Sequence, residues 1–572
     1  MLKRVITLVL LCSSVLVSGQ EEWSSNQPAF EILQQRGEVY FSFKTDKPVE
    51  IDFITQILSI DKLVDGRIWA YANREGFENF LTLNIDYRTE IAPSLRGDAR
   101  MYSEFNSKEN YDWDAYPTFE MYQQMMYDFA ANYPAICTVE KIGESVEGKD
   151  ILVLKISDAV ELDESEPEFL YTSTIHGDET TGYVLLLRLA DYLLSNYGAD
   201  PRITSIVNNM EIWINPLANP DGTYWMGTST VNGAIRFNAN QIDLNRNFPD
   251  PLGGLHPDGN PWQSENVVMM NFMNQHHFIM SCNMHGGTEV MNYPWDTMEK
   301  RHADDDWYYY TSREYVDTVH ANKPSNWGGY FSFQDNGITN GYDWYTIDGG
   351  RQDYVNYYLG MREVTLELSN IKTPQANLLP AYWDTHYSSL LNYLEQAQYG
   401  IRGFVSDAIT GEPLKAKIEI IGHDFDNSHI HSSELHGEYY RLLAEGTYEL
   451  QFSAKGYATE TRNNVVVINH QAVFLDVALD TSSITGIEDQ NLILLKIYPN
   501  PASDYVLISH GDKSIRTLTL SLLDELGREI RKKNIENPDE LIELSIQNLS
   551  PGLYFIRLRS VNKTGLSKLI IH

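Results

Sequence analysis

Cysteine is scarce in this chain, with three among 572 residues, and one of these, Cys12, lies in the N-terminal apolar run. The other two, Cys137 and Cys282, cannot form a disulfide framework that stabilises a chain of this length. Long apolar runs are also missing. Beyond residue 19 we find no stretch long and apolar enough to span a bilayer, so the sequence predicts no transmembrane segment.

Basic residues are few relative to acidic ones. The chain has 43 Lys and Arg against 79 Asp and Glu, a formal net charge of −36. Such a surface repels nucleic acid and anionic membranes, and it could attract cationic peptides. We therefore expect no nucleic-acid partner. The length predicts several domains and at least one large core.

Residues 1–19 have the pattern of a secretory signal peptide. Lys3 and Arg4 precede an apolar run, and Val17-Ser-Gly19 supplies the small residues of a cleavage site. Leu11 before Cys12 is not a small residue, which argues against a lipoprotein anchor. The pattern predicts an exported protein.

The next two segments of the chain differ in their sequence pattern. Residues 20–105 contain strand-like runs at 38–43 and 51–54, and they fit a pro-segment, a folding helper or a plain accessory module. Residues 106–399 alternate buried-looking strands with helices. This alternation predicts an α/β domain with a mixed, mostly parallel central sheet flanked by helices, open to ligands beyond the strand ends.

Helical patterns stop near residue 400. Residues 400–481 carry short alternating strands separated by Gly and Pro turns, and residues 492–572 repeat this texture after a linker. Both segments are typical of all-β sandwich modules.

The stretch from Thr174 to Gly182 contains the first candidate metal ligands. Apolar, β-leaning residues lead into it and a helical pattern leads out, so we expect His176 at a strand end and Glu179 at a helix start. A catalytic zinc uses three ligands of this kind and keeps a fourth position for water. Alone the pattern is weak, because a second His-x-x-Glu stands at residues 431–434, where no helix is predicted.

Two later strands supply further candidates. His285 ends the strand 278–284 and opens a Gly-Gly turn where backbone can approach a metal closely, which makes it the third candidate ligand. Glu367 lies between apolar residues in the last strand. Burying a carboxylate there is costly unless its charge is used, and beside a zinc-activated water it could serve as general base.

Polar residues between these strands could bind a substrate. Arg236 and the Asn245-Arg246 pair follow a turn at 219–222, and arginine offers a planar, two-pronged donor to a carboxylate. Tyr345 could cap a substrate with its hydroxyl group, or it could be a core residue. Each arginine alone fits an ordinary surface position as well.

Together these stretches resemble the zinc carboxypeptidases of the funnelin family, and within it the regulatory branch with carboxypeptidases E, N, M and D. The matching stretches are His176-Gly-Asp-Glu179, Asn219-Pro-Asp-Gly222, Asp243-Leu-Asn-Arg-Asn-Phe248, His285-Gly-Gly287, Gly337-Ile-Thr-Asn-Gly341, Trp344-Tyr345, Gly349-Gly-Arg-Gln-Asp353 and Thr365-Leu-Glu-Leu-Ser369. They span most of residues 111–399 in the family's order.

The resemblance implies the zinc carboxypeptidase fold and the removal of single C-terminal residues from peptides or proteins. It implies one Zn²⁺ per catalytic domain, held by His176, Glu179 and His285, with Glu367 as general base for the attacking water. It further implies that Arg236 polarises the scissile carbonyl, that Asn245 and Arg246 hold the terminal carboxylate, and that Tyr345 closes over it.

Asp296 is the candidate for specificity. It ends a run that starts at His285, so it should line the pocket just past the scissile bond. In the branch that the chain resembles, the matching aspartate meets a basic side chain with Asn292 and Gln352 nearby, which implies a preference for C-terminal Lys or Arg. The alternative is a solvated loop acid. Arg351 departs from the branch, which usually has Met beside Gln352.

The two β segments also resemble known modules. Residues 400–481 resemble the transthyretin-like domain that follows the catalytic domain in this branch. Residues 492–572 resemble the C-terminal sorting domain of the type IX secretion system of Bacteroidetes, through Tyr498-Pro-Asn-Pro501 and Pro551-Gly-Leu-Tyr-Phe-Ile556. This implies the type IX machinery as a partner, and export through the periplasm of a Bacteroidetes-type Gram-negative bacterium to the cell surface or beyond.

Two other classes of function compete with a secreted metallocarboxypeptidase. One is a catalytically dead relative that binds peptides or mediates adhesion, but such proteins typically lose a ligand or the base, and here those positions are filled. The other is a different hydrolase on the same fold, such as an amidase of cell-wall peptides or a deacylase. The Asn245-Arg246 pair and Asp296 favour the carboxypeptidase.

Overall fold

The computed structural model describes residues 26–44, 51–64, 66–97, 99–102 and 111–481, and beyond residue 481 it describes shorter pieces of the chain. These pieces are 495–498, 500–502, 505–510, 515–524, 528–538, 541–547, 549–560 and 563–571. The predicted signal peptide lies outside the described residues. The chain divides into two compact units, residues 1–481 and 482–572. Within the described ranges no helix is long and apolar enough to cross a membrane.

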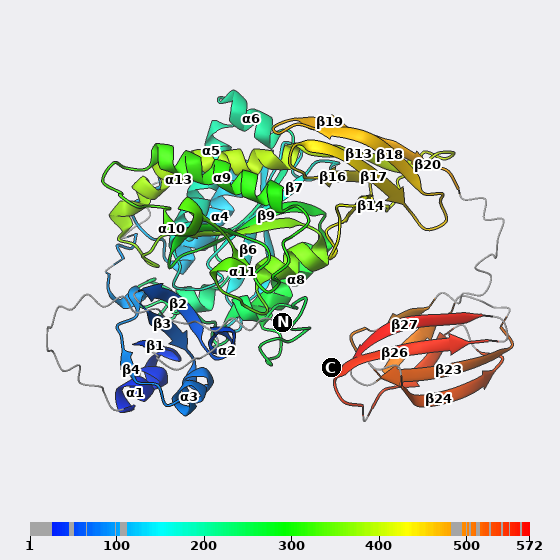
Figure 1. The fold of residues 1–572 in the computed structure, drawn as a ribbon, viewed down its shortest axis with the longest axis horizontal. Helices are drawn as coiled ribbons and strands as arrows, with labels where there is room; N and C mark the ends of the chain where they lie inside the picture. The colour runs from blue at the N-terminus through cyan, green and yellow to red at the C-terminus, as the bar shows by residue number, and fades with distance from the viewer. Residues whose placement is uncertain are drawn as a thin grey trace. The chain divides into compact units, whose positions relative to one another are not determined.

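An eight-stranded mixed sheet organises the first unit (Figure 1). Its order is β11-β10-β12-β9-β7-β8-β6-β5. The strands are β5 (Cys137–Glu144), β6 (Asp150–Ile156), β7 (Glu168–Ser173), β8 (Glu211–Asn215), β9 (Phe278–His285), β10 (Glu289–Tyr293), β11 (Ile338–Asn340) and β12 (Arg362–Leu368). The central strands β12, β9, β7 and β8 are parallel neighbours, whereas β6 and β10 join them antiparallel. The predicted mixed sheet with a parallel centre is confirmed.

Helices cover both faces of this sheet. One core contains α4 (Phe119–Asn132), α5 (Thr181–Asn196), α9 (Asp305–Asn322) and α13 (Leu379–Glu395), and a second core contains α8 (Ser264–Gln275). In β7, Phe169 and Tyr171 belong to the first core and Leu170 to the second. Because successive side chains of a strand point to opposite faces, a sheet covered on both sides needs continuous apolar strands.

Short helical segments lie within the loops that connect these strands and helices. They are α6 (Pro201–Val207), α7 (Pro220–Thr223), η2 (Leu244–Arg246), α10 (Phe333–Asn336), α11 (Gly341–Trp344), α12 (Arg351–Tyr354), η3 (Val355–Leu359), η4 (Ala376–Leu378) and η5 (Gln396–Gln398). Cys137 and Cys282 are buried free thiols, so stability rests on packing, as the sequence predicts.

Parallel strands end at one edge of the sheet, and the candidate residues gather there. His285 is the last residue of β9, and Glu367 of β12 is its partner in the strand register. The prediction that His176 ends a strand and Glu179 begins a helix is wrong. β7 ends at Ser173 and α5 begins at Thr181, so both residues lie in the connecting loop.

The N-terminal segment forms a small sheet of its own, in the order β2-β3-β1-β4. Its strands are β1 (Val39–Phe43), β2 (Ser59–Val64), β3 (Arg67–Ala72) and β4 (Tyr87–Thr89), and its helices are α1 (Gln27–Arg36), α2 (Ile51–Ile57), α3 (Arg74–Thr82) and the turn η1 (Pro93–Leu95). The predicted strand at 51–54 is wrong, because these residues are helical. Ile54 and Leu58 are both buried, and their spacing of four residues is that of a helix face.

Residues 400–481 form the predicted β sandwich. Its strands are β13 (Gly400–Asp407), β14 (Lys417–Ile420), β15 (Ile430–His431), β16 (Glu438–Arg441), β17 (Gly446–Ser453), β18 (Glu460–Val467), β19 (Ala472–Phe474) and β20 (Val477–Leu479). One sheet holds β16, β13, β19 and β20, the other β15, β14, β17 and β18, and apolar residues of both enclose one core.

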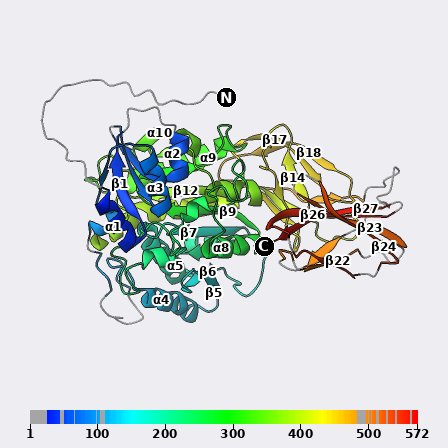
Figure 2. The ribbon, with the colours of Figure 1, turned by 90° about the horizontal axis from the view of Figure 1, so that it is seen from below.

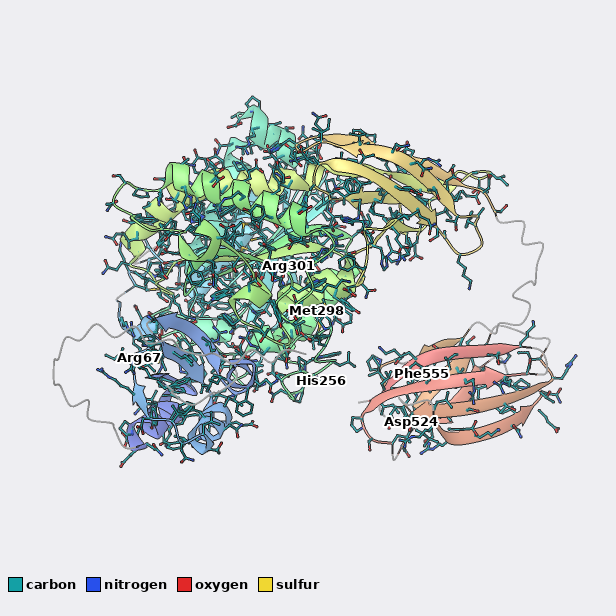
Figure 3. The ribbon with its side chains drawn as sticks, in the orientation of Figure 1. Arg67, His256, Met298, Arg301, Asp524 and Phe555 are labelled. Carbon is teal, nitrogen blue, oxygen red and sulfur yellow. The ribbon has the colours of Figure 1, made fainter. Side chains whose placement is uncertain are left out.

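The second unit is also all-β within its described residues. Its sheets have the orders β21-β22-β25 and β24-β23-β26-β27 around one apolar core. The strands are β21 (Lys496–Tyr498), β22 (Tyr505–Ser509), β23 (Thr517–Asp524), β24 (Glu529–Glu536), β25 (Leu541–Ser545), β26 (Gly552–Arg559) and β27 (Thr564–Ile571). Asp524 and Phe555 mark β23 and β26 in Figure 3.

Candidate active site

Two imidazoles and a carboxylate meet beyond the carboxyl ends of β7 and β9. His176 Nδ1 lies 3.1 Å from His285 Nδ1, and Glu179 Oε2 lies 3.0 Å and 2.9 Å from these two nitrogens. A tetrahedral zinc with bonds of about 2.0 Å separates its ligand atoms by roughly 3.3 Å. All three residues are at most 3% exposed. The donor types and their spacing therefore fit a zinc ion.

Each imidazole is oriented through its other nitrogen. His176 Nε2 lies 3.1 Å from Asp243 Oδ1, and His285 Nε2 lies 2.8 Å from the side-chain amide of Asn283. A carboxylate at Nε2 keeps the proton there and leaves the Nδ1 lone pair for a metal. Burial lowers the pKa of His285 to about 4, so its ring is neutral, which is the form that binds metal.

The second oxygen of Glu179 has cationic partners. Lys372 Nζ lies 2.8 Å from Glu179 Oε1, and Arg236 Nη1 lies 3.5 Å from the same atom. Burial raises the pKa of Glu179, but His176 and Lys372 outweigh it and hold the pKa well below its usual range. Glu179 is therefore ionised and available as an anionic ligand.

Glu367 lines the same cavity as the three ligands. Its Oε2 atom is buried and has no hydrogen-bond partner among the residues that the structure describes. Burial raises the pKa of Glu367 well above its usual range, and the Glu179 carboxylate adds to this effect, while Lys372 opposes it. A carboxylate with a raised pKa and an unpaired oxygen suits proton transfer.

The structure brings the predicted substrate residues to this cavity. Its lining includes Arg236, Asn245, Arg246, Asn292, Asp296 and Tyr345. Gln352 is not among the lining residues, but its side-chain amide donates a hydrogen bond of 3.0 Å to Asp296 Oδ1. The second His-x-x-Glu stretch, residues 431–434, lies apart in the β sandwich, and Glu434 is exposed there.

Asp296 is a buried acid in a polar setting. Asn292 Nδ2 donates to its Oδ1 at 2.9 Å, and Asp353 accepts from its backbone N–H at 2.9 Å. Asp296 is 4% exposed, which excludes the alternative that it is a solvated acid on a surface loop. Burial raises the pKa of Asp296 to about 6, against the opposing hydrogen bond from Asn292.

Arg351, the departure from the branch pattern, does not face the cavity. Its Nη2 donates to Glu363 Oε2 at 2.8 Å, its Nη1 donates to Thr172 Oγ1 at 2.5 Å, and it is 1% exposed. Its charge is therefore neutralised by Glu363 inside the domain.

Sequence comparisons bear on this arrangement. A model of the zinc carboxypeptidase family matches residues 122–389. Mouse carboxypeptidase M is 36% identical over 345 residues, which cover 57% of this chain and 75% of that protein. The chain belongs to the zinc carboxypeptidase family. Carboxypeptidase E of Caenorhabditis elegans is 30% identical over 421 residues, covering 66% of this chain and 89% of that protein.

Other matches concern length and the flanking modules. Human carboxypeptidase D is 34% identical over 401 residues, 68% of this chain, and the match spans 28% of that longer protein. A carboxypeptidase regulatory-like domain matches residues 400–480, and a secretion-system C-terminal sorting domain matches residues 496–572. These matches confirm the resemblances found in the sequence.

Two charged residues of this zinc carboxypeptidase site were missed by sequence reasoning. Asp243 accepts from Arg236 Nε at 3.0 Å and also contacts His176. Its place two residues before Asn245 in a matching stretch could have revealed it. Lys372 lies in a loop after β12, where a lysine carries no pattern that separates it from a surface residue.

Proposed function

We propose that this chain is a zinc metallocarboxypeptidase that removes single C-terminal residues, with a preference for Lys and Arg. The observation that carries this proposal is the shared cavity. It joins the His176-Glu179-His285 set, the carboxylate of Glu367 and the buried acid Asp296. A cavity with ligands for a metal, a base and an anionic pocket is suited to hydrolysis next to a cationic side chain.

The chemistry divides among few residues. His176, Glu179 and His285 would hold Zn²⁺, which supplies a Lewis acid for the scissile carbonyl and the attacking water. Glu367 takes the proton from the water and delivers it to the leaving amine. Arg236, held by Asp243, donates to the carbonyl oxygen as negative charge develops there.

Charged and polar side chains of the cavity recognise the C-terminal residue of the substrate. Arg246 and Asn245 bind the terminal carboxylate, and the Arg246 Nε atom is a buried donor without a partner among the described residues. Burial raises the pKa of Tyr345 to about 12, although Arg246 opposes this, so the phenol keeps its proton and can donate over the bound end. Asp296 pairs with the side chain of a C-terminal Lys or Arg.

We further propose that the enzyme is exported. The support is the match of residues 496–572 to a secretion-system C-terminal sorting domain. These residues belong to a compact unit separate from the catalytic one, as a transferable tag requires. Together with the signal-like residues 1–19, this favours passage through the periplasm and type IX export in a Bacteroidetes-type bacterium.

Three matched peptides test the activity. Zinc-loaded protein is mixed with peptides that end in free Arg, in free Leu and in Arg amide, and the products are identified by mass spectrometry. We expect loss of one residue from the Arg peptide, slower loss from the Leu peptide and none from the amide. Cleavage of the amidated peptide would point to an amidase, and binding without any cleavage would point to an inactive relative.

A further inference from the structure

Polar side chains follow one face of the central sheet, although helices cover the sheet on both sides. β7, β9 and β12 lie side by side there (Figure 2). Alternate residues of a strand share a face, and on β9 one such set is Ser281, Asn283 and the candidate ligand His285. Ser281 is 0% exposed and Asn283 is 1% exposed. Polar groups buried to this degree need hydrogen-bond partners inside the protein.

The two neighbouring strands provide these partners. Asn283 lies opposite Thr172 of β7, and the Thr172 hydroxyl group donates to Asn283 Oδ1 at 3.0 Å. Ser281 lies opposite Glu363 of β12 and donates to Glu363 Oε2 at 2.8 Å. Thr172 and Glu363 are each 0% exposed. Because Glu363 places a carboxylate in the interior of the domain, it needs a cation beside it.

Arg351 is that cation, and it comes from outside the sheet. It is the first residue of α12, and its Nη2 atom donates to Glu363 Oε2 at 2.8 Å. Its Nη1 atom donates to Thr172 Oγ1 at 2.5 Å. One planar guanidinium group therefore bridges β12 and β7, the strands on either side of β9. The compact ammonium group of a lysine lacks this fixed fork of donors.

The bridge continues to the candidate metal site. Thr172 connects Arg351 to Asn283, and the side-chain amide of Asn283 lies 2.8 Å from His285 Nε2. Arginine only donates, whereas a hydroxyl group and an amide can each donate or accept. This line of hydrogen bonds can therefore be kept whichever ring nitrogen of His285 carries the proton.

Arg351 also contacts a residue of the proposed substrate site. Its backbone N–H donates to Asn245 Oδ1 at 2.8 Å, and Asn245 lines the cavity. An amide whose oxygen is held in this way offers its N–H groups to an incoming carboxylate, which only accepts. The ion pair between Arg351 and Glu363 anchors α12 to the sheet, and it thereby fixes the position of this backbone donor.

We propose that Arg351 is a positioning residue that acts on two sides of the site. Through Thr172 and Asn283 it orients the candidate ligand His285. Through its backbone N–H it orients Asn245 toward the carboxylate of a substrate. The branch that the chain resembles usually has Met here, and a Met side chain has no N–H group to form the bridge. This inference rests on the proposed function, because it requires a metal at His285 and a carboxylate at Asn245.

Thr172→Val tests the side of the metal. It keeps a branched side chain, leaves the Arg351–Glu363 pair intact and breaks the connection to Asn283. Ser281→Ala is the matched control, because it removes a buried hydroxyl group that contacts the same ion pair but not Asn283. A direct outer partner of a ligand typically contributes about 10–100-fold in metal affinity. One bond further out, we expect Thr172→Val to lower zinc affinity at least fivefold and Ser281→Ala to match the wild type.

Zinc dissociation constants are measured by chelator competition without substrate, so this result does not depend on peptidase activity. The visible absorption spectrum of the protein loaded with Co²⁺ should also change in Thr172→Val, because that spectrum responds to the geometry of the ligands. A merely structural threonine would leave the spectrum unchanged. Equal zinc affinities in Thr172→Val and Ser281→Ala, whether both at the wild-type value or both lowered, would overturn the role of the bridge.

The paired substitution Arg351→Met with Glu363→Gln tests the side of the substrate. Both charges are removed together, since removing one alone would leave the other buried without a partner. With zinc at saturation, we expect the KM for a peptide ending in free Arg to rise at least tenfold, while kcat stays within threefold of the wild type. Thr172→Val should keep the wild-type KM, because α12 keeps its anchor. A wild-type KM in the paired variant would overturn the role toward Asn245.

Arg351→Lys replaces the paired variant if that protein does not fold. It keeps a cation beside Glu363 and loses the fork that also reaches Thr172. We expect zinc affinity to fall at least threefold in Arg351→Lys, and wild-type zinc affinity together with a wild-type KM would overturn the proposal. A wild-type protein that cleaves no peptide would overturn the proposed function instead, and the zinc measurements would still decide the role toward His285.

Discussion

Asp243 Oδ1 lies 3.1 Å from His176 Nε2. The other oxygen of this carboxylate accepts from Arg236 Nε at 3.0 Å and from Ser59 Oγ at 2.6 Å. Burial raises the pKa of Asp243, but Arg236 and His176 outweigh it and hold the pKa well below its usual range. One ionised side chain thus links a candidate metal ligand, the proposed carbonyl donor and strand β2 of the N-terminal sheet.

Asp243→Asn should weaken zinc binding while the protein stays folded. The amide keeps the shape, but it no longer stabilises the Nε2 proton of His176 with a negative charge. Loss of such an outer partner typically lowers metal affinity about 10–100-fold. Zinc dissociation constants from chelator competition give the measure, with Asp317→Asn as a control because its side chain is 62% exposed. Equal affinity in both variants would remove Asp243 from this role.

Glu367→Gln should separate binding from chemistry. The substitution keeps the volume and removes the base, so each molecule should still hold one zinc. A positioned base is worth about 10²–10⁴-fold in rate, and kcat should fall within that range. Metal analysis and steady-state kinetics on the Arg peptide check both statements. A variant that retains more than a tenth of the wild-type kcat would exclude Glu367 as the base.

The sequence predicted the site better than its surroundings. The catalytic fold was predictable because strands buried on both faces are continuous apolar runs, and the candidate ligand His285 stands at the end of such a strand. The helix at 51–57 was mistaken for a strand, since four residues are too few to distinguish the two periods. Tyr71 and Asp178 are 107 positions apart, and no local sequence pattern around either residue predicts their hydrogen bond.

The proposed preference for C-terminal Lys and Arg should depend on pH through Asp296. Burial raises its pKa to about 6, so the carboxyl group is neutral below that pH and anionic above it. The ratio of kcat/KM for C-terminal Arg to that for C-terminal Leu should therefore fall by up to tenfold per pH unit below about pH 6. Comparing the ratio cancels groups that affect both substrates.

Asp296→Ala provides the control for that profile. It should lower kcat/KM far more for Arg than for Leu, and the ratio should no longer change near pH 6. A wild-type ratio that stays constant from pH 5 to pH 8, or a wild-type preference for Phe over Arg, would rule out Asp296 as the specificity residue.

Gly341→Ala should damage specificity without removing the metal. A Cβ atom at Gly341 would lie 1.8 Å from Asp296 Oδ1, so the carboxylate has to move. Gly341 does not have a positive φ, so the backbone itself is not strained by alanine. We expect the Arg-to-Leu ratio of kcat/KM to fall at least tenfold, with zinc content unchanged. Gly328→Ala is the matched control, because a Cβ there meets nothing within 4 Å. Equal ratios in both variants would show that the position of the Asp296 carboxylate does not set the preference.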